Sequence, residues 1–211
     1  MNFTTHRGRA LRAFAAATAL SMASTAVLAA SPAASACPAQ GFLSGNLAVN
    51  PSFELPTPGP SATASVCWRA GMPLPATSAA AGWLMHSSND GARVCSRLIP
   101  GSAPGPGGAR MLAFQAASNE GGIYQAQPLD PAKAYMFSVW VLVQSGQVAI
   151  QSRNMIGGPV AWSSKTGEWE QLRVCTNSMA NTDSLVIFNQ AAGGGRFVVD
   201  RVEVREIPIR E

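Results

Sequence analysis

The chain has 211 residues, with 15 Lys and Arg against 11 Asp and Glu. Three of the basic residues, all arginine, lie in residues 1–36, which contain no acidic residue, so 12 basic and 11 acidic residues remain, a net charge of +1. A nearly neutral chain of this length fits one domain. It lacks the positive charge typical of nucleic-acid-binding proteins, so we expect no nucleic-acid partner.

Residues 1–36 are typical of a secretory signal peptide. Three arginines precede an uncharged run rich in alanine and serine, and the small residues Ala34 and Ala36 match the preference of signal peptidase. We predict cleavage near Ala36 and secretion of residues 37–211 to the extracellular or periplasmic space. A transmembrane helix is the weaker interpretation, because the apolar run is rich in alanine and serine and lies at the extreme N-terminus. No other stretch approaches the roughly 20 apolar residues that a span needs.

Four cysteines follow this segment, and an even number in an exported protein favours two disulfides. Three pairings can be drawn. We favour Cys67 with Cys95 and Cys37 with Cys175, because the last two would lie near or within strands that bracket the domain. An alternative is lipidation of Cys37, since the residues before it resemble a lipobox, but this would leave one thiol unpaired. Zinc is not expected, because no Cys-x-x-Cys pair occurs and His86 is the only histidine after residue 36.

Beyond residue 36 the apolar residues occur in short runs separated by Gly, Pro, Asn and Ser, with no long helical period. This pattern predicts β-strands. Eight such runs suit two packed sheets, so we predict an all-β jelly-roll β-sandwich of two antiparallel sheets. The runs are residues 46–54, 110–115, 122–127, 135–143, 147–155, 168–176, 184–190 and 196–207.

The connections between these runs can also be predicted. Gln144-Ser145-Gly146 separates two β-rich runs and predicts a hairpin in which those runs pair with each other. Residues 55–82 and 100–108 are rich in Pro, Gly, Ala and Ser and predict loops. No internal repeat or second domain is evident, so we expect residues 37–211 to form a single β-sandwich.

Several motifs occur in an order that resembles a known family. They are Asn46-Leu-Ala-Val-Asn-Pro-Ser-Phe-Glu54, Gly82-Trp83, Gly122-Ile-Tyr-Gln-Ala-Gln127, Ala134-Tyr-Met-Phe-Ser-Val-Trp-Val141, Gly167-Glu-Trp-Glu-Gln-Leu-Arg173 and Arg196-Phe-Val-Val-Asp-Arg-Val202. Together they are similar to the carbohydrate-binding modules of families four, nine and twenty-two, which share a galactose-binding-like jelly roll. The similarity spans nearly all of residues 46–207.

The resemblance implies a structural calcium ion between the first and last strands. Glu54 and Asp200 match the positions of the family's acidic ligands, although Arg201 stands where many relatives have a second Asp. Calcium takes about 6 to 8 oxygen ligands. The alternative is that Glu54 hydrogen-bonds the neighbouring loop while Asp200 pairs with an arginine, and neither binds metal.

The resemblance also implies a secreted, non-catalytic module that binds a polysaccharide or oligosaccharide through a cleft on one sheet. Aromatic faces stack on sugar rings, and planar polar side chains bind the hydroxyl groups. The structural alternatives are core packing for the tryptophans and a solvated strand face for the strand residues. The candidate binding residues are Trp140, Trp162, Gln151, Arg153 and Asn189.

Catalysis is not expected, because a glycosidase needs two carboxyl groups about 5 to 9.5 Å apart across one bond and no such pair stands out. A jelly-roll polysaccharide lyase with Tyr124 or Tyr135 as base is a less favoured alternative. The main competing function is a secreted protein–protein or cell-surface interaction domain on the same fold. An exposed apolar patch without convergent polar groups would indicate that function. We expect a monomer, and the pattern does not identify the glycan.

Overall fold

The computed structural model describes residues 37, 41–57, 64–72, 77–87, 92–105, 108–127, 129–153, 159–176 and 184–209. The predicted signal peptide and its cleavage site lie outside these ranges. The regular elements of the described residues are all β-strands. Over these same ranges, the chain contains no helix long and apolar enough to cross a membrane.

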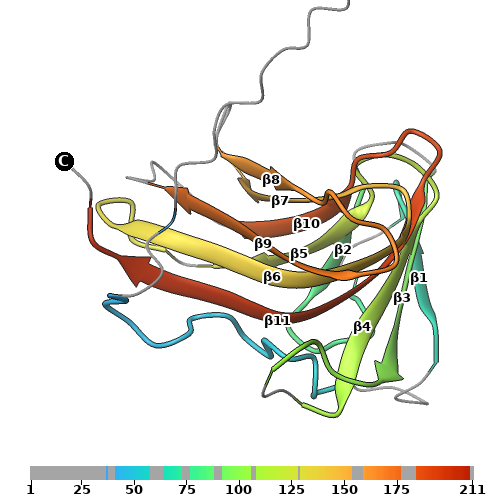
Figure 1. Cartoon of the computed structure of the whole chain (residues 1–211). Helices are drawn as coiled ribbons and strands as arrows, with labels where there is room; N and C mark the ends of the chain where they lie inside the picture. Colours follow the sequence, from blue (N-terminus) through green and yellow to red (C-terminus); the bar gives the residue numbers. More distant parts are fainter. Residues whose placement is uncertain are drawn as a thin grey trace, which may run out of the picture. The chain divides into compact units, whose positions relative to one another are not determined.

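Within the described residues, eleven strands form two antiparallel sheets (Figure 1). The six-stranded sheet has the order β1-β3-β4-β11-β6-β9, and the five-stranded sheet has the order β2-β5-β10-β7-β8. The predicted two-sheet jelly-roll sandwich is therefore confirmed. The strands are β1 Val66–Arg69, β2 Leu84–His86, β3 Arg93–Pro100, β4 Arg110–Ala116, β5 Gly122–Ala126, β6 Ala134–Ser145, β7 Val148–Arg153, β8 Val160–Trp162, β9 Trp169–Thr176, β10 Ser184–Asn189 and β11 Gly195–Ile207.

The hydrophobic core lies between the sheets because apolar side chains alternate along the strands. In β6, Phe137 and Val139 are buried in the core, whereas Trp140 lies on the opposite face of the sheet and is only partly buried. Trp83 is 1% exposed and packs against Phe53, with 5.3 Å between the ring centroids. Each strand therefore presents one set of side chains to the core and the other set to an outer face.

The prediction of a strand over residues 46–54 is wrong. This segment runs beside β11, where the N–H of Leu47 donates to the carbonyl of Val204 at 2.8 Å, but it has no ladder of its own. The Asn46 side chain replaces ladder bonds: its amide N–H donates to the carbonyl of Val202, and its oxygen accepts from the N–H of Val204. Phe53 has a φ of 54°, a left-handed conformation that breaks the extended backbone.

The predicted hairpin at Gly146 is also wrong, because the chain passes there from one sheet to the other. Strand β6 pairs with β11 and β9, while β7 pairs with β10 and β8. Gly146 has a φ of 82°, and a Cβ atom there would lie 2.7 Å from Oδ1 of Asn189. A short glycine turn between two strands is compatible with a hairpin or with a crossing, and only the pairing partners decide between them.

Two disulfides confirm the pairing that the sequence analysis favours, Cys37–Cys175 and Cys67–Cys95. Cys67 and Cys95 lie directly opposite each other on β1 and β3, with 4.1 Å between their Cα atoms. Strand β1 lies within residues 55–82, so the prediction of a loop over that whole range is wrong. Because Cys37 is disulfide-bonded, it has no free thiol to carry a lipid.

Candidate functional site

The outer face of the five-stranded sheet carries aromatic rings and amides that the strand pairing brings into rows. On β5, β7 and β10 the isoleucines point into the core, so the residues between them point outward. Residues directly opposite on neighbouring strands lie side by side. One row holds Leu84, Tyr124, Val186, Gln151 and Val160, and the next holds His86, Gly122, Phe188, Ala149 and Trp162.

These rows border a hollow of about 360 Å³, which we call the aromatic hollow. Neighbouring strands are about 4.8 Å apart, so Phe188 and Trp162, two strands apart, occupy positions separated by roughly 10 Å. The small side chain of Ala149 lies between them in the row. The aromatic hollow is lined by His86, Glu120, Gln151, Val160, Trp162, Val186, Phe188 and Gln190.

Trp162 is 41% exposed at the edge of the sheet, an unusual position for so large an apolar side chain. Its backbone is nevertheless well anchored by the next residue. The N–H of Ser163 donates to the carbonyl of Val148 at 2.8 Å, and Oγ of Ser163 accepts from the N–H of Val148 at 2.9 Å. A held backbone with an exposed indole is suited to contact with another molecule.

The middle and the far end of the aromatic hollow are also built from rings. His86 and Tyr124 form an edge-to-face pair with 6.2 Å between the ring centroids. Phe188 sits against Gly122, where an added Cβ would lie 2.7 Å from the Cβ of Phe188. The absence of a side chain at Gly122 therefore lets Phe188 lie close to the neighbouring strand. Rings thus mark both ends and the centre of the surface.

Asn189 is fully buried and organises the turns beside the aromatic hollow. Its side-chain amide donates to the carbonyl of Ser118 at 2.9 Å and to that of Ala191 at 2.8 Å. Its backbone carbonyl accepts from the N–H of Glu120 at 2.6 Å. Asn189 therefore positions the segments that carry Glu120 and Gln190 at the rim, and its own amide is used within the fold.

The structure brings together two of the five predicted binding residues, Gln151 and Trp162. Trp140 lies on the six-stranded sheet and so cannot share this cleft with Trp162. Arg153 ends strand β7, and its side chain lies outside the described residues.

The site also contains four residues that are not among those predicted from the sequence: His86, Glu120, Phe188 and Gln190. The pairing of β2, β5, β10 and β7, which brings them together, cannot be read from one sequence. A signal for Phe188 was available. In β10 the residues Leu185 and Ile187 alternate with Val186 and Phe188, which places the second pair on one face.

Glu54 and Asp200, the two predicted metal ligands, lie near the segment that joins β3 to β4. Asp200 is fully buried, and its carboxylate accepts from the N–H groups of Ala103 and Arg201, both at 2.8 Å. Glu54 Oε1 accepts from the N–H of Arg110 at 3.0 Å. Burial raises the pKa of Asp200, the hydrogen bonds and Arg201 oppose that rise, and the charge of Glu54 adds to it.

The donor set around these carboxylates does not fit a calcium ion, which takes about 6 to 8 oxygen ligands. Both carboxylates already accept main-chain N–H bonds. The guanidinium of Arg201 donates to the carbonyl of Pro104 at 2.5 Å and also to that of Gly105, so a protein cation occupies this loop. Nowhere in the described ranges do three or more His, Cys, Asp or Glu side chains form a group that could hold a metal.

The sequence matches no protein-family model and no curated protein. Solved structures similar to the chain include carbohydrate-binding modules. One is TmCBM61 in complex with β-1,4-galactotriose, at 15% identity and a TM-score of 0.46, covering 76% of this chain and 98% of that one. Another is the family 11 carbohydrate-binding module from Clostridium thermocellum in complex with a β-1,3-1,4-mixed-linked tetrasaccharide, at 15% identity and a TM-score of 0.42, covering 72% and 99%.

A third similar structure comprises the CBM22-1 and GH10 modules of Clostridium thermocellum endo-1,4-β-D-xylanase 10B complexed with xylohexaose. Its identity is 17% and its TM-score 0.42, and the match covers 59% of this chain. The chain spans only 26% of that protein. All three TM-scores are low, so the ligand of this chain has to be inferred from its own residues.

Proposed function

We propose that the chain is a secreted, non-catalytic carbohydrate-binding module that holds a neutral polysaccharide or oligosaccharide in the aromatic hollow. The observation that carries this proposal is the exposed indole of Trp162 beside the amide of Gln151 on one hollowed sheet face. The indole provides a flat apolar surface for a sugar ring, and the amides of Gln151 and Gln190 supply donors and acceptors for hydroxyl groups. The row of rings across several strands suits an extended chain.

The chemistry of the lining favours binding over hydrolysis. Glycoside hydrolysis uses two carboxyl groups on opposite sides of one bond. Glu120 is the one carboxylate among the described residues that line the aromatic hollow. Among its described residues, the surface therefore offers contact groups for a glycan without the paired acid and base that bond cleavage requires.

Two disulfides support the secreted location, because such bonds persist in oxidising compartments and are rare in the cytosol. They agree with the signal peptide expected over residues 1–36.

The test is affinity electrophoresis of the oxidised protein in gels that contain xylan, β-glucan, mannan or soluble cellulose derivatives. We expect retardation by at least one neutral glycan. Trp162→Ala should weaken that interaction at least tenfold, equivalent to about 1.4 kcal/mol. Trp140→Ala is the matched control, because it removes an indole from the other sheet. The proposal fails if no neutral glycan retards the protein, or if both variants lose binding equally while remaining folded.

A second candidate function, a protein-interaction domain, is favoured by a different surface. Four aliphatic side chains in residues 41–57 are 40% to 62% exposed: Leu43, Leu47, Val49 and Leu55. Exposed apolar side chains are typical of contact surfaces between proteins when they form one continuous patch. Under the first proposal, serine substitutions at Leu47 and Val49 should leave retardation by the glycan unchanged. The second function would be favoured if the wild-type protein bound no glycan and these substitutions abolished binding of a protein partner.

A further inference from the structure

The outer face of the six-stranded sheet is rich in arginine at its β1 end. Strands β1, β3 and β4 contain four arginines and no acidic residue. Arg69 and Arg93 lie directly opposite each other on β1 and β3, and both are exposed. Like charges directly opposite on neighbouring strands destabilise a sheet. The guanidiniums of Arg69 and Arg93 therefore repel each other here, although the net charge of residues 37–211 is close to zero.

Two more arginines border a hollow of about 340 Å³ on the same face, which we call the arginine hollow. Arg97 projects from β3 and Arg196 from β11, and both are exposed. Within the described part of the chain, neither guanidinium has a carboxylate partner. The arginine hollow is lined by Ser65, Cys95, Ser96, Arg97, Ala113, Phe114, Gln115, Gln144, Arg196 and Phe197.

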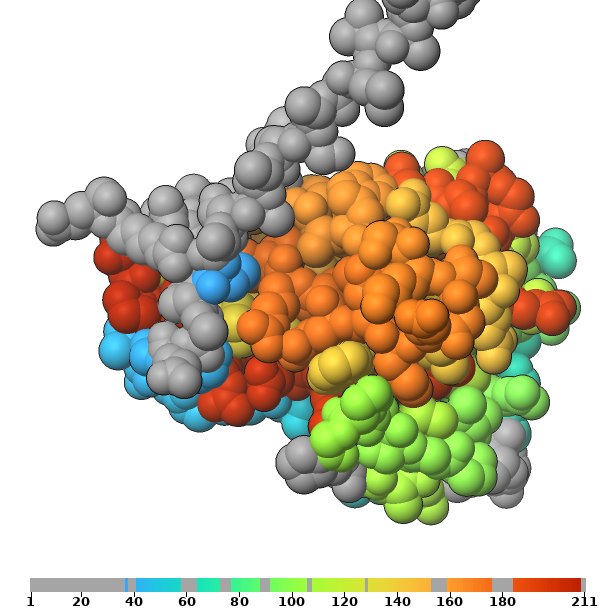
Figure 2. Space-filling model, in the orientation of Figure 1, coloured from blue at the N-terminus to red at the C-terminus, as the bar shows by residue number. Residues whose placement is uncertain are grey.

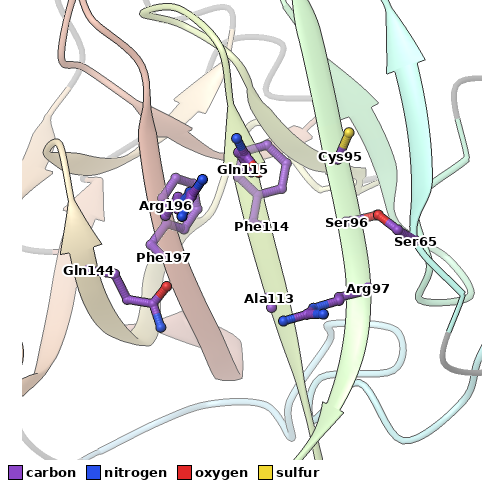
Figure 3. A pocket seen from close by; sticks show the side chains of 10 residues that line it. All are labelled: Ser65, Cys95, Ser96, Arg97, Ala113, Phe114, Gln115, Gln144, Arg196 and Phe197. Atoms are coloured by element: carbon purple, nitrogen blue, oxygen red, sulfur yellow. The ribbon is translucent and has the colours of Figure 1, made fainter.

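Polar side chains from β3, β6 and β11 surround the arginine hollow. Figure 3 shows Arg97 and Gln144 extending toward each other across Ala113, with Arg196 on the same side of the sheet. Gln115 lies opposite Arg196 in the register of β4 and β11. Guanidinium and amide groups thus surround a small alanine that leaves room above it. An adjoining hollow adds Arg93 and shares Ser65, Cys95 and Gln115 with the first.

The nearest acidic residues of β11 are engaged elsewhere. Asp200 is buried and accepts main-chain hydrogen bonds. Glu203 pairs with Arg205 at 3.2 Å. Neither carboxylate is available to neutralise Arg97 or Arg196.

We propose that the arginine hollow is a second binding site, which takes the acidic group of an anionic saccharide, a uronate carboxylate or a sulfate ester. Guanidinium groups bind such oxyanions through paired, charge-assisted hydrogen bonds. The amides of Gln115 and Gln144 can bind the hydroxyl groups of the same sugar. An anion bound there also offsets the positive charge of this face, where Arg93 borders the adjoining hollow. This site is on the opposite side of the sandwich from the aromatic hollow and does not depend on it.

A saccharide fits the arginine hollow better than a nucleic acid does. Single-stranded nucleic acids are held by aromatic side chains on which the bases stack, together with basic grooves. The aromatic residues of the lining, Phe114 and Phe197, are 3% and 1% exposed and have their rings in the core. They offer no free face for a base. Amides beside arginines instead match a ligand with both hydroxyl and acidic groups.

The test is calorimetric titration of the oxidised protein at low ionic strength with trigalacturonate, a heparin-derived tetrasaccharide and a neutral cello-oligosaccharide. The variant Arg97→Gln/Arg196→Gln removes both guanidiniums and keeps polar side chains. The control Lys165→Gln/Arg173→Gln makes the same charge change at two other exposed positions. We expect an acidic oligosaccharide to bind at least tenfold more weakly to the first variant and within twofold of wild type to the control. Thermal melts establish that both variants are folded.

The outcomes separate the ligand sources. Tighter binding of trigalacturonate assigns the site to carboxylates, and tighter binding of the heparin fragment assigns it to sulfates. The proposal is overturned if neither acidic saccharide binds, or if the control variant loses as much affinity as the arginine variant. It is also overturned if a single-stranded oligonucleotide binds the same arginines more tightly than either saccharide. Trp162→Ala should retain acidic-saccharide binding, so failure of the neutral-glycan proposal is distinguished from failure of this one.

Discussion

The two outer faces of the sandwich differ in chemistry although they share one core. The five-stranded sheet presents rings and amides around Trp162, whereas the six-stranded sheet presents Arg97 and Arg196, which have no carboxylate partner among the described residues. Each strand gives alternate side chains to the core and the rest to its own face. Because the outward set contributes little to the core, the two faces can acquire different ligands without a change of fold.

The arginines of the six-stranded sheet also fall into two kinds. Arg201 donates to the carbonyls of Pro104 and Gly105 and holds the segment between β3 and β4. Arg97 and Arg196 have no such partners among the described residues. In Figure 2, residues of the β3–β4 region, in green, and of the β8–β9 region, in orange, lie at the surface. Partnered arginines act within the fold, and unpartnered ones are free to contact a ligand.

The largest effect is expected from the disulfide between β1 and β3. The variant Cys67→Ser/Cys95→Ser opens a cross-link over a sequence separation of 28 residues, which we expect to lower the free energy of unfolding by about 2–4 kcal/mol. Urea unfolding measures this loss. Below the transition, acidic-saccharide binding should weaken because β1 is an edge strand beside the arginine hollow, while neutral-glycan binding persists. Equal loss on both faces would contradict their independence.

Arg201→Gln is expected to have the next largest effect. It removes two solvent-exposed, charge-assisted bonds to the carbonyls of Pro104 and Gly105. Because water competes for exposed groups, we expect a loss of about 1–2 kcal/mol in total. The melting temperature should fall by several degrees, whereas Arg173→Gln on the same sheet should change it little. Chelation with EDTA should leave the melting temperature of the wild type unchanged. A drop on chelation that added calcium reverses would show that a metal ion, and not Arg201, holds this segment.

A smaller effect, on ligand binding, distinguishes the two faces by salt. Raising the ionic strength to about 1 M shortens the screening length to about 3 Å, so affinity for an acidic oligosaccharide should fall roughly tenfold or more. Affinity for a neutral oligosaccharide in the aromatic hollow should change less than about twofold, since stacking and hydroxyl contacts involve no net charge. Titrations in matched buffers check both. Parallel salt dependence for the two ligands would mean that they share one site.

The smallest effect concerns the buried carboxylate of β11. Burial raises the pKa of Asp200 above its ordinary value of 3.8, so the folded state binds this proton more tightly than the unfolded state does. The resulting stabilisation is fully present below pH 3.8 and is lost as the pH rises through the raised pKa. Asp200→Asn cannot titrate, so the difference in unfolding free energy between wild type and variant should shift against the wild type over this window. Identical pH profiles in urea unfolding would contradict the assignment.

Much of the fold could be predicted, because the alternation of apolar and polar residues and the Gly- and Pro-rich breaks between strands are local properties of the chain. Val202 and Val204, two residues apart in β11, are both buried, as strand alternation requires, and Trp83 is in the core. The errors fall where local pattern admits two outcomes. Residues 46–54 alternate like a strand, but the side chain of Asn46 takes the bonds that a ladder would use. The turn at Gly146 crosses between sheets because β6 finds its partners in β9 and β11.

The sequence by itself determined the all-β class, the alternation that builds the core and, from four cysteines, the expectation of two disulfides. Those features depend on residue type and on spacing along the chain. Only the tertiary structure decided that Trp162 and Gln151 share a face while Trp140 lies on the other sheet, and that Arg97 and Arg196 meet at one hollow. The physical reason is that a sheet face is assembled from strands distant in sequence, so its chemistry depends on strand order and register, which no single strand encodes.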